Sequence, residues 1–341
     1  MKLLITGVNG YVGLNLYSYL KNLGYEVHGL DLKTHRSVTG DASLHVCDIR
    51  DDESLDALIK SLKPDAIFHL ASLLGHDKAG KNEFLATNLQ GTKNVFSAAA
   101  KHQVQKFVFI STNAVWCESN SSLVSESLPH SYVEKYGESK SQCEQFLLSN
   151  NSKVSVVILR APIIMGPNRL GLFSLLFSLI SEQKRIYLPR AENNVIEILD
   201  ISDLLDVLNL CLDEKFKGIF NLGTNSSFSL NDYIQELINR SGSKSKLILL
   251  PNKMVVLGLK FLYRIKLSPF GIYQIDSLLN QFQMSSTKIN LLSGWKPLVN
   301  PHNSIWSAYE SFLKRASSDL DFEEKSANMK PIDFFLGKLL R

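Results

Sequence analysis

The chain has 341 residues, a formal net charge of +4 and an apolar fraction of 45%, which are values of an ordinary globular protein. The small charge argues against nucleic acid as a partner, and the length allows one large domain or two modest ones. Because no run of about 18 apolar residues occurs, no membrane-spanning helix is expected.

The first predicted strand begins at residue 2, and no targeting segment is expected ahead of it. The four cysteines are scattered without metal-site spacing, at Cys47, Cys117, Cys143 and Cys211. We interpret them as free thiols in a reducing compartment. The sequence therefore predicts a cytoplasmic protein without a bound metal.

The first two thirds of the chain alternate short apolar runs with helical patterns. The predicted strands are Lys2–Thr6, Glu26–Asp31, Ser43–Cys47, Ala66–Leu70, Lys106–Ser111 and Ser155–Arg160. The predicted helices are Gly13–Leu23, Asp52–Leu62, Asn88–Lys101 and Lys135–Leu148. This alternation predicts an α/β fold, a Rossmann-type doubly wound parallel sheet with right-handed crossovers.

The pattern changes after Arg160, where Pro162, Gly166 and Pro167 follow. We expect Ile196–Leu212, a strand and then a helix, and the strand Gly218–Leu222 to return to the sheet. The predicted nucleotide-binding domain then comprises residues 1–165 and about 195–223. A smaller substrate-binding lobe comprises residues of about 166–194 and 224–315, and residues 316–341 form a C-terminal tail.

A glycine loop, residues 7–13, links the first strand to the first helix. Such glycines allow a tight turn and a close approach of the backbone to a pyrophosphate. The predicted cofactor contacts here are Gly7, Asn9, Gly10, Tyr11, Val12 and Gly13. The alternative is a tight turn without a ligand.

Acidic residues end the second and third strands. Asp31 lies about 20 residues beyond the loop, where an acid accepts ribose hydroxyls and repels a 2′-phosphate. This favours NAD, although Lys33 and Arg36 nearby keep NADP possible. We expect Asp48 and Ile49 to border the adenine; the alternative for Asp48 is an exposed loop acid.

Tyr136 and Lys140 are four residues apart, so they share one face of a predicted helix. A tyrosine ordinarily has a pKa of about 10, and a neighbouring ammonium favours its ionised form. Thr112 follows Ser111 at the end of a strand, where open α/β sheets bind ligands. The alternative role of these two hydroxyls is capping a turn.

Six motifs in this order resemble the extended short-chain dehydrogenase/reductases, and more narrowly the NAD-dependent epimerase/dehydratase family that acts on nucleotide sugars. The motifs are residues 6–13, His69–Ser72, Asn88–Thr92, Ser111–Thr112, Tyr136–Lys140 and Arg160–Pro167. The resemblance covers about residues 1–300.

The resemblance implies a role for each matching position. Tyr136 is the expected acid/base, Lys140 holds the nicotinamide ribose, Thr112 binds the reacting oxygen with Ser111 beside it, and Asn88 holds the geometry of the site. The nicotinamide side of the cofactor is expected to pass along Leu70, Ala71, Ser72 and Pro162.

Two departures from the family pattern bear on which reaction the protein catalyses. Dehydratases of this family carry an acidic pair directly after the threonine, but this chain has Asn113 and Ala114, so sugar dehydration is not expected. Trp116 and Cys117 replace the tyrosine and glycine that follow. Trp116 is expected to pack over the sugar or in the core, and Cys117 to be inert.

Two arginines that bind the diphosphate of the substrate in this family are absent here, one from Asn193–Glu197 and one from Asn280–Ser286. The candidate replacements are Arg169, Lys184, Arg185 and Arg190, of which Arg169 and Arg190 are the predicted substrate contacts. The alternative for each is a solvated surface charge.

The stretch between Glu236 and Asp276 contains seven basic residues and no acidic one. Within it, Lys253, Lys260 and Arg264 share one helical face, and another face gathers Val255, Val256, Leu259 and Leu262. We expect a helix whose apolar side packs against the smaller lobe and whose basic side is exposed to solvent. The alternative is weak association with an anionic membrane surface.

The function predicted from these features is NAD(P)-dependent hydride transfer at a ring carbon of a nucleotide sugar, by an epimerase or a 4-keto-sugar reductase. Two alternatives are open: a dehydrogenase of a lipid-like or steroid-like alcohol, and a non-catalytic NAD-binding protein. We expect a homodimer.

Overall fold

The computed structural model describes residues 1–33, 41–74, 80–116, 123–150, 152–169, 171, 173–190, 195–226, 228–265 and 283–317. Some predictions concern residues outside these ranges, namely Arg36, Cys117, 191–194, 266–282 and 318–341.

The centre of the fold is a parallel sheet of seven strands in the order β11-β7-β5-β4-β1-β2-β3. The strands are β1 (Lys2–Thr6), β2 (Glu26–Asp31), β3 (Leu44–Val46), β4 (Ala66–His69), β5 (Lys106–Thr112), β7 (Ser155–Ala161) and β11 (Gly218–Asn221). The strand order reverses between β1 and β4, which is where doubly wound sheets bind ligands at the carboxyl ends of their strands. The predicted fold class is confirmed.

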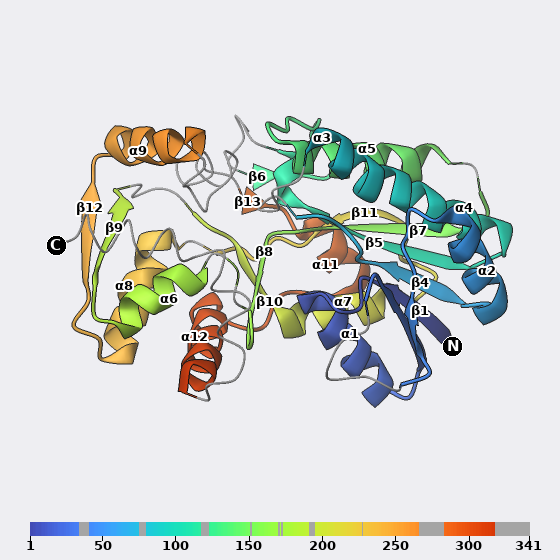
Figure 1. Cartoon of the computed structure of the whole chain (residues 1–341), viewed down its shortest axis with the longest axis horizontal. Coiled ribbons are helices and arrows are strands. Elements are labelled where there is room, and N and C mark those ends of the chain that lie inside the picture. The colour runs from blue at the N-terminus through green and yellow to red at the C-terminus, as the bar shows by residue number, and fades with distance from the viewer. Residues whose placement is uncertain are drawn as a thin grey trace.

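Helices cover both faces of this sheet (Figure 1). One face carries α1 (Tyr11–Asn22) and α7 (Ile201–Leu210), and the other carries α2 (Asp52–Leu62), α4 (Gly91–Lys101) and α5 (Lys135–Ser149). Alternation along β1 separates two cores: Leu3 and Ile5 pack on the α1 side, and Leu4 packs on the α2 side. Strands that are apolar on both faces thus form the buried centre.

A smaller group of elements lies beside the sheet, at the left of Figure 1. It pairs β9 (Arg185–Pro189) with β12 (Lys246–Leu250) and carries α6 (Phe173–Ser181), α8 (Leu230–Ser241), α9 (Asn252–Arg264) and α12 (Pro301–Ser317). Phe177, Tyr233 and Tyr309 are buried in its core. A capping box of Ser229 and Asp232 begins α8.

Short ladders connect the two parts: β8 (Ile163–Met165) with β10 (Ile198–Asp200), and β6 (Leu123–Val124) with β13 (Gln283–Met284). The prediction that both later strands return to the sheet is wrong for β10. Pro162, which has no N–H for a ladder bond, separates β7 from β8, and β8 then pairs with β10. Only β11 joins the sheet, beside β7.

The remaining helical elements are α3 (Lys81–Phe84), a π-helical turn (Leu85–Gln90), a 3₁₀ turn (Asn113–Val115) and α11 (Thr287–Ser293). Two residues from the range predicted for the smaller lobe, Ile289 and Trp295, pack in the core on the α1 side of the sheet. Within the described ranges, no helix is long and apolar enough to cross a membrane.

Candidate functional site

The glycine loop between β1 and α1 needs glycine for steric reasons. Gly7 has a φ of +73°, and a Cβ there would lie 2.7 Å from the backbone of Ala71. A Cβ on Gly13 would lie 2.3 Å from the carbonyl oxygen of Gly7. The loop therefore lies directly against the residues that follow β4.

The N-terminus of α1 is open to an anion. Gly10 is its N-cap, no side chain caps the helix, and its first turn has no acid. Uncapped amides and the helix dipole together favour a phosphate at such a position. Nearby, the Asp31 carboxylate accepts the N–H groups of Asn9 (2.9 Å) and Leu32 (2.7 Å) and keeps further acceptor capacity for a ribose. These features fit a dinucleotide.

The predicted adenine neighbours have local partners. The side chain of Arg50 pairs with the Asp48 carboxylate at 2.6 Å and lowers the pKa of Asp48. Ile49 is buried against Gly91, where a Cβ would lie 2.5 Å from the Ile49 side chain. Contact of these residues with an adenine stays a prediction.

Gly137 brings the first turn of α5 against the end of β5. A Cβ on Gly137 would lie 2.2 Å from the carbonyl oxygen of Ala114. Ala114 belongs to the turn after Thr112, and its N–H donates to the Thr112 hydroxyl at 3.1 Å. This close approach places the turn that carries Tyr136 beside the half-buried Thr112.

Lys140 is buried one turn further along α5. Its ammonium donates to the carbonyl oxygen of Ile110 at 3.0 Å and lies 4.5 Å from the ring centre of Phe109. Burial lowers the pKa of Lys140 to about 8, because removing an ammonium from water disfavours its charged form. The side chain is therefore a cation that gains strongly from a further polar partner.

Asn88 links the loop after β4 to α5. It lies in the π-helical turn, a feature that is frequent at functional sites. Its side-chain amide bonds both backbone groups of Leu73 and donates to the Ser139 hydroxyl at 2.9 Å. Ser139 donates in turn to the carbonyl oxygen of Tyr136 at 2.8 Å. Asn88 thus holds the backbone at Tyr136 from behind.

A second buried chain of hydrogen bonds runs through His69. The N–H of Ala71 donates to the Thr6 hydroxyl, and Thr6 lies 2.7 Å from His69 Nδ1. Thr92 donates to the carbonyl oxygen of Asn88 and lies 2.9 Å from His69 Nε2. Since the single Thr92 hydrogen is used, Nε2 carries the imidazole hydrogen and Nδ1 accepts from Thr6. Burial, with a smaller contribution from the Lys140 charge, lowers the pKa of His69 to about 3.

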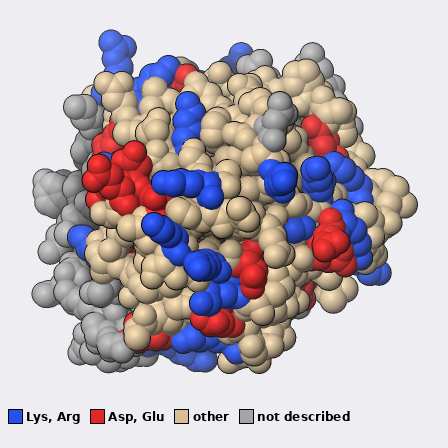
Figure 2. Space-filling model, turned by 90° about the vertical axis from the view of Figure 1, so that its right-hand side faces the viewer, with Lys and Arg blue, Asp and Glu red and all other residues tan. Residues whose placement is uncertain are grey.

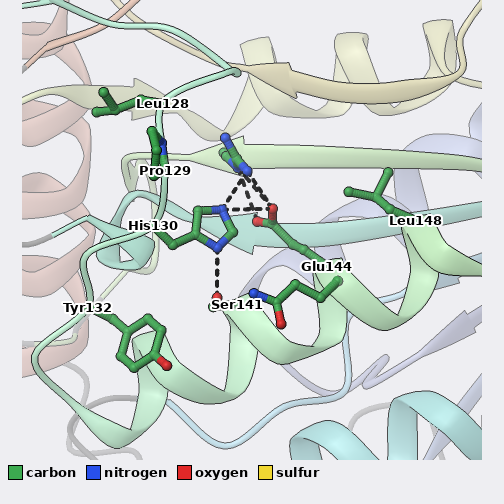
Figure 3. Close-up of a pocket in the computed structure, with 9 residues that line it drawn as sticks. Leu128, Pro129, His130, Tyr132, Ser141, Glu144 and Leu148 are labelled. Carbon is green, nitrogen blue, oxygen red and sulfur yellow. Dashed lines mark hydrogen bonds and ion pairs between the residues drawn. The ribbon is translucent and has the colours of Figure 1, made fainter.

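Ser111 and Thr112 point to opposite sides of β5, as alternation along a strand requires. The Ser111 hydroxyl donates to the buried carboxylate of Glu144, which also pairs with Arg160 at 2.6 Å. Figure 3 shows His130 between Glu144 and Ser141 in this cluster. Burial opposes ionisation of Glu144, but His130 and Arg160 outweigh it and lower the pKa. The cluster borders a cavity of about 480 Å³, whose lining also includes Tyr132 and Leu148.

Trp116 belongs to this second cluster. Its ring is fully buried and lies 4.6 Å below the Arg160 guanidinium. The indole N–H donates to the carbonyl oxygen of Leu128. This placement corresponds to the predicted core alternative rather than to a sugar contact.

Arg169 lies near the reacting side of the site. Its guanidinium is 5.1 Å from the ring centre of Tyr11 and interacts electrostatically with the phenol of Tyr136. Burial lowers the pKa of Arg169, and the two phenols oppose that shift. The Tyr11 hydroxyl is buried and has no hydrogen-bond partner among the described residues. Arg169 and Tyr11 thus offer polar groups to a ligand beside Tyr136.

The other predicted contacts are placed as follows. Leu70 bonds the carbonyl oxygen of Thr6, Ser72 donates to Leu73, and Pro162 is buried between β7 and β8. Arg190 is exposed, and its backbone bonds Leu250 and Asn231. Among the described contacts, none links Arg190 to Tyr136 or Thr112.

Sequence reasoning gave no role to His69, Thr92, His130 or Glu144. His69 was part of a motif, but its function as a neutral bridge depends on hydroxyls far away in the chain. Glu144 follows Lys140 by four residues, a spacing that indicates a neighbouring helical position. Nothing in the sequence indicated that Arg160 and His130 would meet it.

A family model described as the NAD dependent epimerase/dehydratase family matches residues 3–223. The chain belongs to this family. The glycine loop, the open end of α1 and Asp31 fit the cofactor in the family's name.

Curated relatives include the UDP-glucose 4-epimerases of Halalkalibacterium halodurans and Bacillus subtilis. The first is 33% identical over 149 residues, covering 42% of this chain and 45% of the relative. The second is 30% identical over 175 residues, covering 47% and 52%. The matched part of the chain spans about half the length of these relatives. A dTDP-D-glucose 4,6-dehydratase of Homo sapiens is 28% identical over 198 residues, covering 56% and 57%.

Many solved structures share the fold, and two of them illustrate the likeness. The Bordetella bronchiseptica enzyme WbmG in complex with NAD aligns with a TM-score of 0.78 at 24% identity, over 94% of this chain and 96% of that one. A UDP-glucose 4-epimerase of Thermotoga maritima with UDP-glucose aligns with a TM-score of 0.78 at 19% identity, over 93% and 100%.

Proposed function

We propose that this protein is an NAD-dependent epimerase of a nucleotide sugar, with Tyr136 as the acid/base. The observation that carries the proposal is the contact of Gly137 with the turn after Thr112. That contact sets the turn of α5 that carries Tyr136 against the turn that follows Thr112, with the buried ammonium of Lys140 one helical turn further on, and this supports a shared role for the three side chains.

The proton path uses only these side chains. Thr112 hydrogen-bonds a ring hydroxyl of the substrate, and Tyr136 removes its proton as the carbonyl forms. Lys140 stabilises the phenolate by its charge and bonds a ribose hydroxyl of the cofactor. The ketone then turns in the pocket and exposes the other face of its carbonyl carbon. Tyr136 finally returns the proton to the ketone oxygen.

NAD, when bound, accepts and returns the hydride at the ring carbon. The open N-terminus of α1 would hold its pyrophosphate and Asp31 its adenosine ribose. A 2′-phosphate would meet the Asp31 carboxylate, and this supports NAD over NADP.

The substrate assignment rests on Arg169 and on the relatives. A half-buried guanidinium beside Tyr136 suits a phosphate or a polyhydroxyl ligand. A steroid-like alcohol would leave that cation without a partner, at a cost in binding. The relatives named for UDP-sugars support the same class.

Epimerisation is favoured over dehydration because no acid follows Thr112. The side-chain oxygen of Asn113 lies 3.4 Å from the Thr112 hydroxyl and accepts from it. An amide at this position can bind and orient the substrate by hydrogen bonds, but it does not act as an acid that protonates a leaving hydroxyl.

The experiment is turnover of a panel of nucleotide sugars, followed by NMR of the products. An epimerase inverts one ring carbon without added cofactor, because the hydride returns to the same sugar. Stoichiometric consumption of NADH would instead assign a 4-keto-sugar reductase. Failure to convert any nucleotide sugar, with bound NAD present, would overturn the proposal. Assembly as a homodimer remains a prediction, which size-exclusion chromatography with light scattering tests.

A further inference from the structure

Helix α9 has two apolar faces, and among the described residues only one of these faces packs on the protein. Val255, Val256, Leu259 and Leu262 are half-buried on the side that faces the smaller lobe, as the sequence predicted. Across the helix, Met254, Leu257 and Phe261 are 63%, 69% and 63% exposed. Their spacing of three and four residues makes one stripe, which we call the outer stripe. None of the residues of α9 is buried.

The outer stripe is not required by the fold. Burial of apolar side chains stabilises a protein, whereas three neighbouring large ones left in water contribute little. Single exposed apolar residues are normal, but a continuous apolar face on one helix marks a contact with something else.

The charges beside the stripe indicate what it contacts. Lys253, Lys260 and Arg264 are exposed and lie roughly 80° around the helix axis from the stripe, by the 3.6-residue repeat. No acidic residue occurs between Glu236 and Asp276. A row of cations beside an apolar face is the pattern of helices that lie in the interface of an anionic bilayer.

The position of α9 allows such a contact. The helix lies at an outer corner of the smaller lobe, away from the seven-stranded sheet (Figure 1). Figure 2 shows the opposite end of the molecule, where Lys and Arg are interspersed with Asp and Glu. The stretch that contains α9 differs from that end because it has no acidic residue.

We propose that α9 docks this protein on the surface of an anionic lipid bilayer. The outer stripe enters the headgroup region and the three cations contact lipid phosphates. With 13 residues the helix is about 20 Å long, so it lies along the surface and does not span it.

The test is co-sedimentation of the full chain with liposomes of phosphatidylglycerol and phosphatidylcholine in equal parts. We expect binding at low salt that weakens as salt is raised, and little binding to phosphatidylcholine alone. Changing Leu257→Ser together with Phe261→Ser should lower binding about tenfold or more. Changing Lys260→Gln together with Arg264→Gln should lower it about tenfold and flatten the salt dependence.

The matched control is Leu291→Ser, which changes a side chain that is 81% exposed on α11. It should bind liposomes like the unchanged protein, and all variants should keep the same unfolding temperature. The proposal is wrong if the unchanged protein does not sediment with anionic liposomes at low salt, or if the stripe variant binds equally well. It is also wrong if that variant instead converts a dimer to a monomer, because a second copy would then cover the stripe.

Discussion

Lys140 and Glu144, neighbours one turn apart on helix α5, hold buried charge in different ways. Lys140 is buried with a carbonyl oxygen and an aromatic ring as neighbours, and burial lowers its pKa although the charge of Glu144 opposes that shift. The Glu144 carboxylate is buried against the Arg160 guanidinium, with His130 and Ser111 completing the cluster.

This difference separates a functional cation from a structural one. A buried charge that is fully paired contributes to holding the fold, and loss of its partner is costly. A buried charge with an incomplete set of partners destabilises the empty protein but binds strongly to what completes it. Mutations at the two positions should therefore have opposite consequences for activity and stability.

Lys140→Met should cause the largest loss of activity. Turnover of the nucleotide sugar should fall about 10²–10⁴-fold, because the phenolate of Tyr136 loses its cation. The free energy of unfolding should rise by about 1–3 kcal/mol, because an apolar side chain replaces a desolvated ammonium. Steady-state kinetics and urea unfolding measure both effects. Lys135→Met, at an exposed position of the same helix, is the control, and a Lys140 variant that loses stability would break the comparison.

Glu144→Gln should mainly reduce stability. The change leaves the buried Arg160 charge without its carboxylate and should lower the free energy of unfolding by about 3–5 kcal/mol. Glu138→Gln makes the same change on α5 in an ion pair with the exposed Lys81 and should cost under about 1 kcal/mol. Equal losses in the two variants would show that the Glu144 cluster has no special structural role.

Gly137→Ala should displace Tyr136 without unfolding the protein. The new methyl group would meet the carbonyl oxygen of Ala114, so the first turn of α5 must move away from Thr112. A shift of this kind should reduce kcat about 10–100-fold. The control is Gly258→Ala, a helical glycine with open space around it, which should slightly stabilise α9. Unchanged kcat in the Gly137 variant would contradict the proposed role of this contact in positioning Tyr136.

His69 should make stability depend on pH. Its pKa is about 3 in the folded protein and about 6.5 when unfolded, so the unfolded chain binds more protons between these values. Its contribution is fully present above pH 6.5 and is lost as the pH falls towards 3, with a slope of about 1.4 kcal/mol per pH unit. His69→Gln should reduce that slope in urea unfolding between pH 4.5 and 6.5. An unchanged slope would mean that His69 does not titrate on unfolding.

The sheet was predictable because its information is local. Strands such as Ala66–His69 are apolar on both faces. The spacing of Gly7, Gly10 and Gly13 is typical of a loop that joins a strand to a helix at a dinucleotide-binding site. The path of β10 was not predictable in the same way. It pairs with β8, a short strand much earlier in the chain, and no local sequence pattern indicates this pairing.

The site was predictable to the extent that its residues form short motifs. Tyr136, Lys140 and Thr112 could be identified from spacing and position, and the structure places them on adjoining elements. The separation of Ser111 from Thr112 follows from strand alternation. The meeting of Arg160, Glu144 and His130 depends on tertiary packing, as does the outer stripe of α9.

The measurement that tests the central claim most directly uses a nucleotide sugar deuterated at the carbon that is inverted. The account predicts that the product keeps the deuterium at that carbon, because the same hydride is removed and returned. It also predicts that Tyr136→Phe slows the conversion at least about 100-fold. Loss of the deuterium to water, or a Tyr136→Phe variant that is as fast as the unchanged protein, would contradict the account.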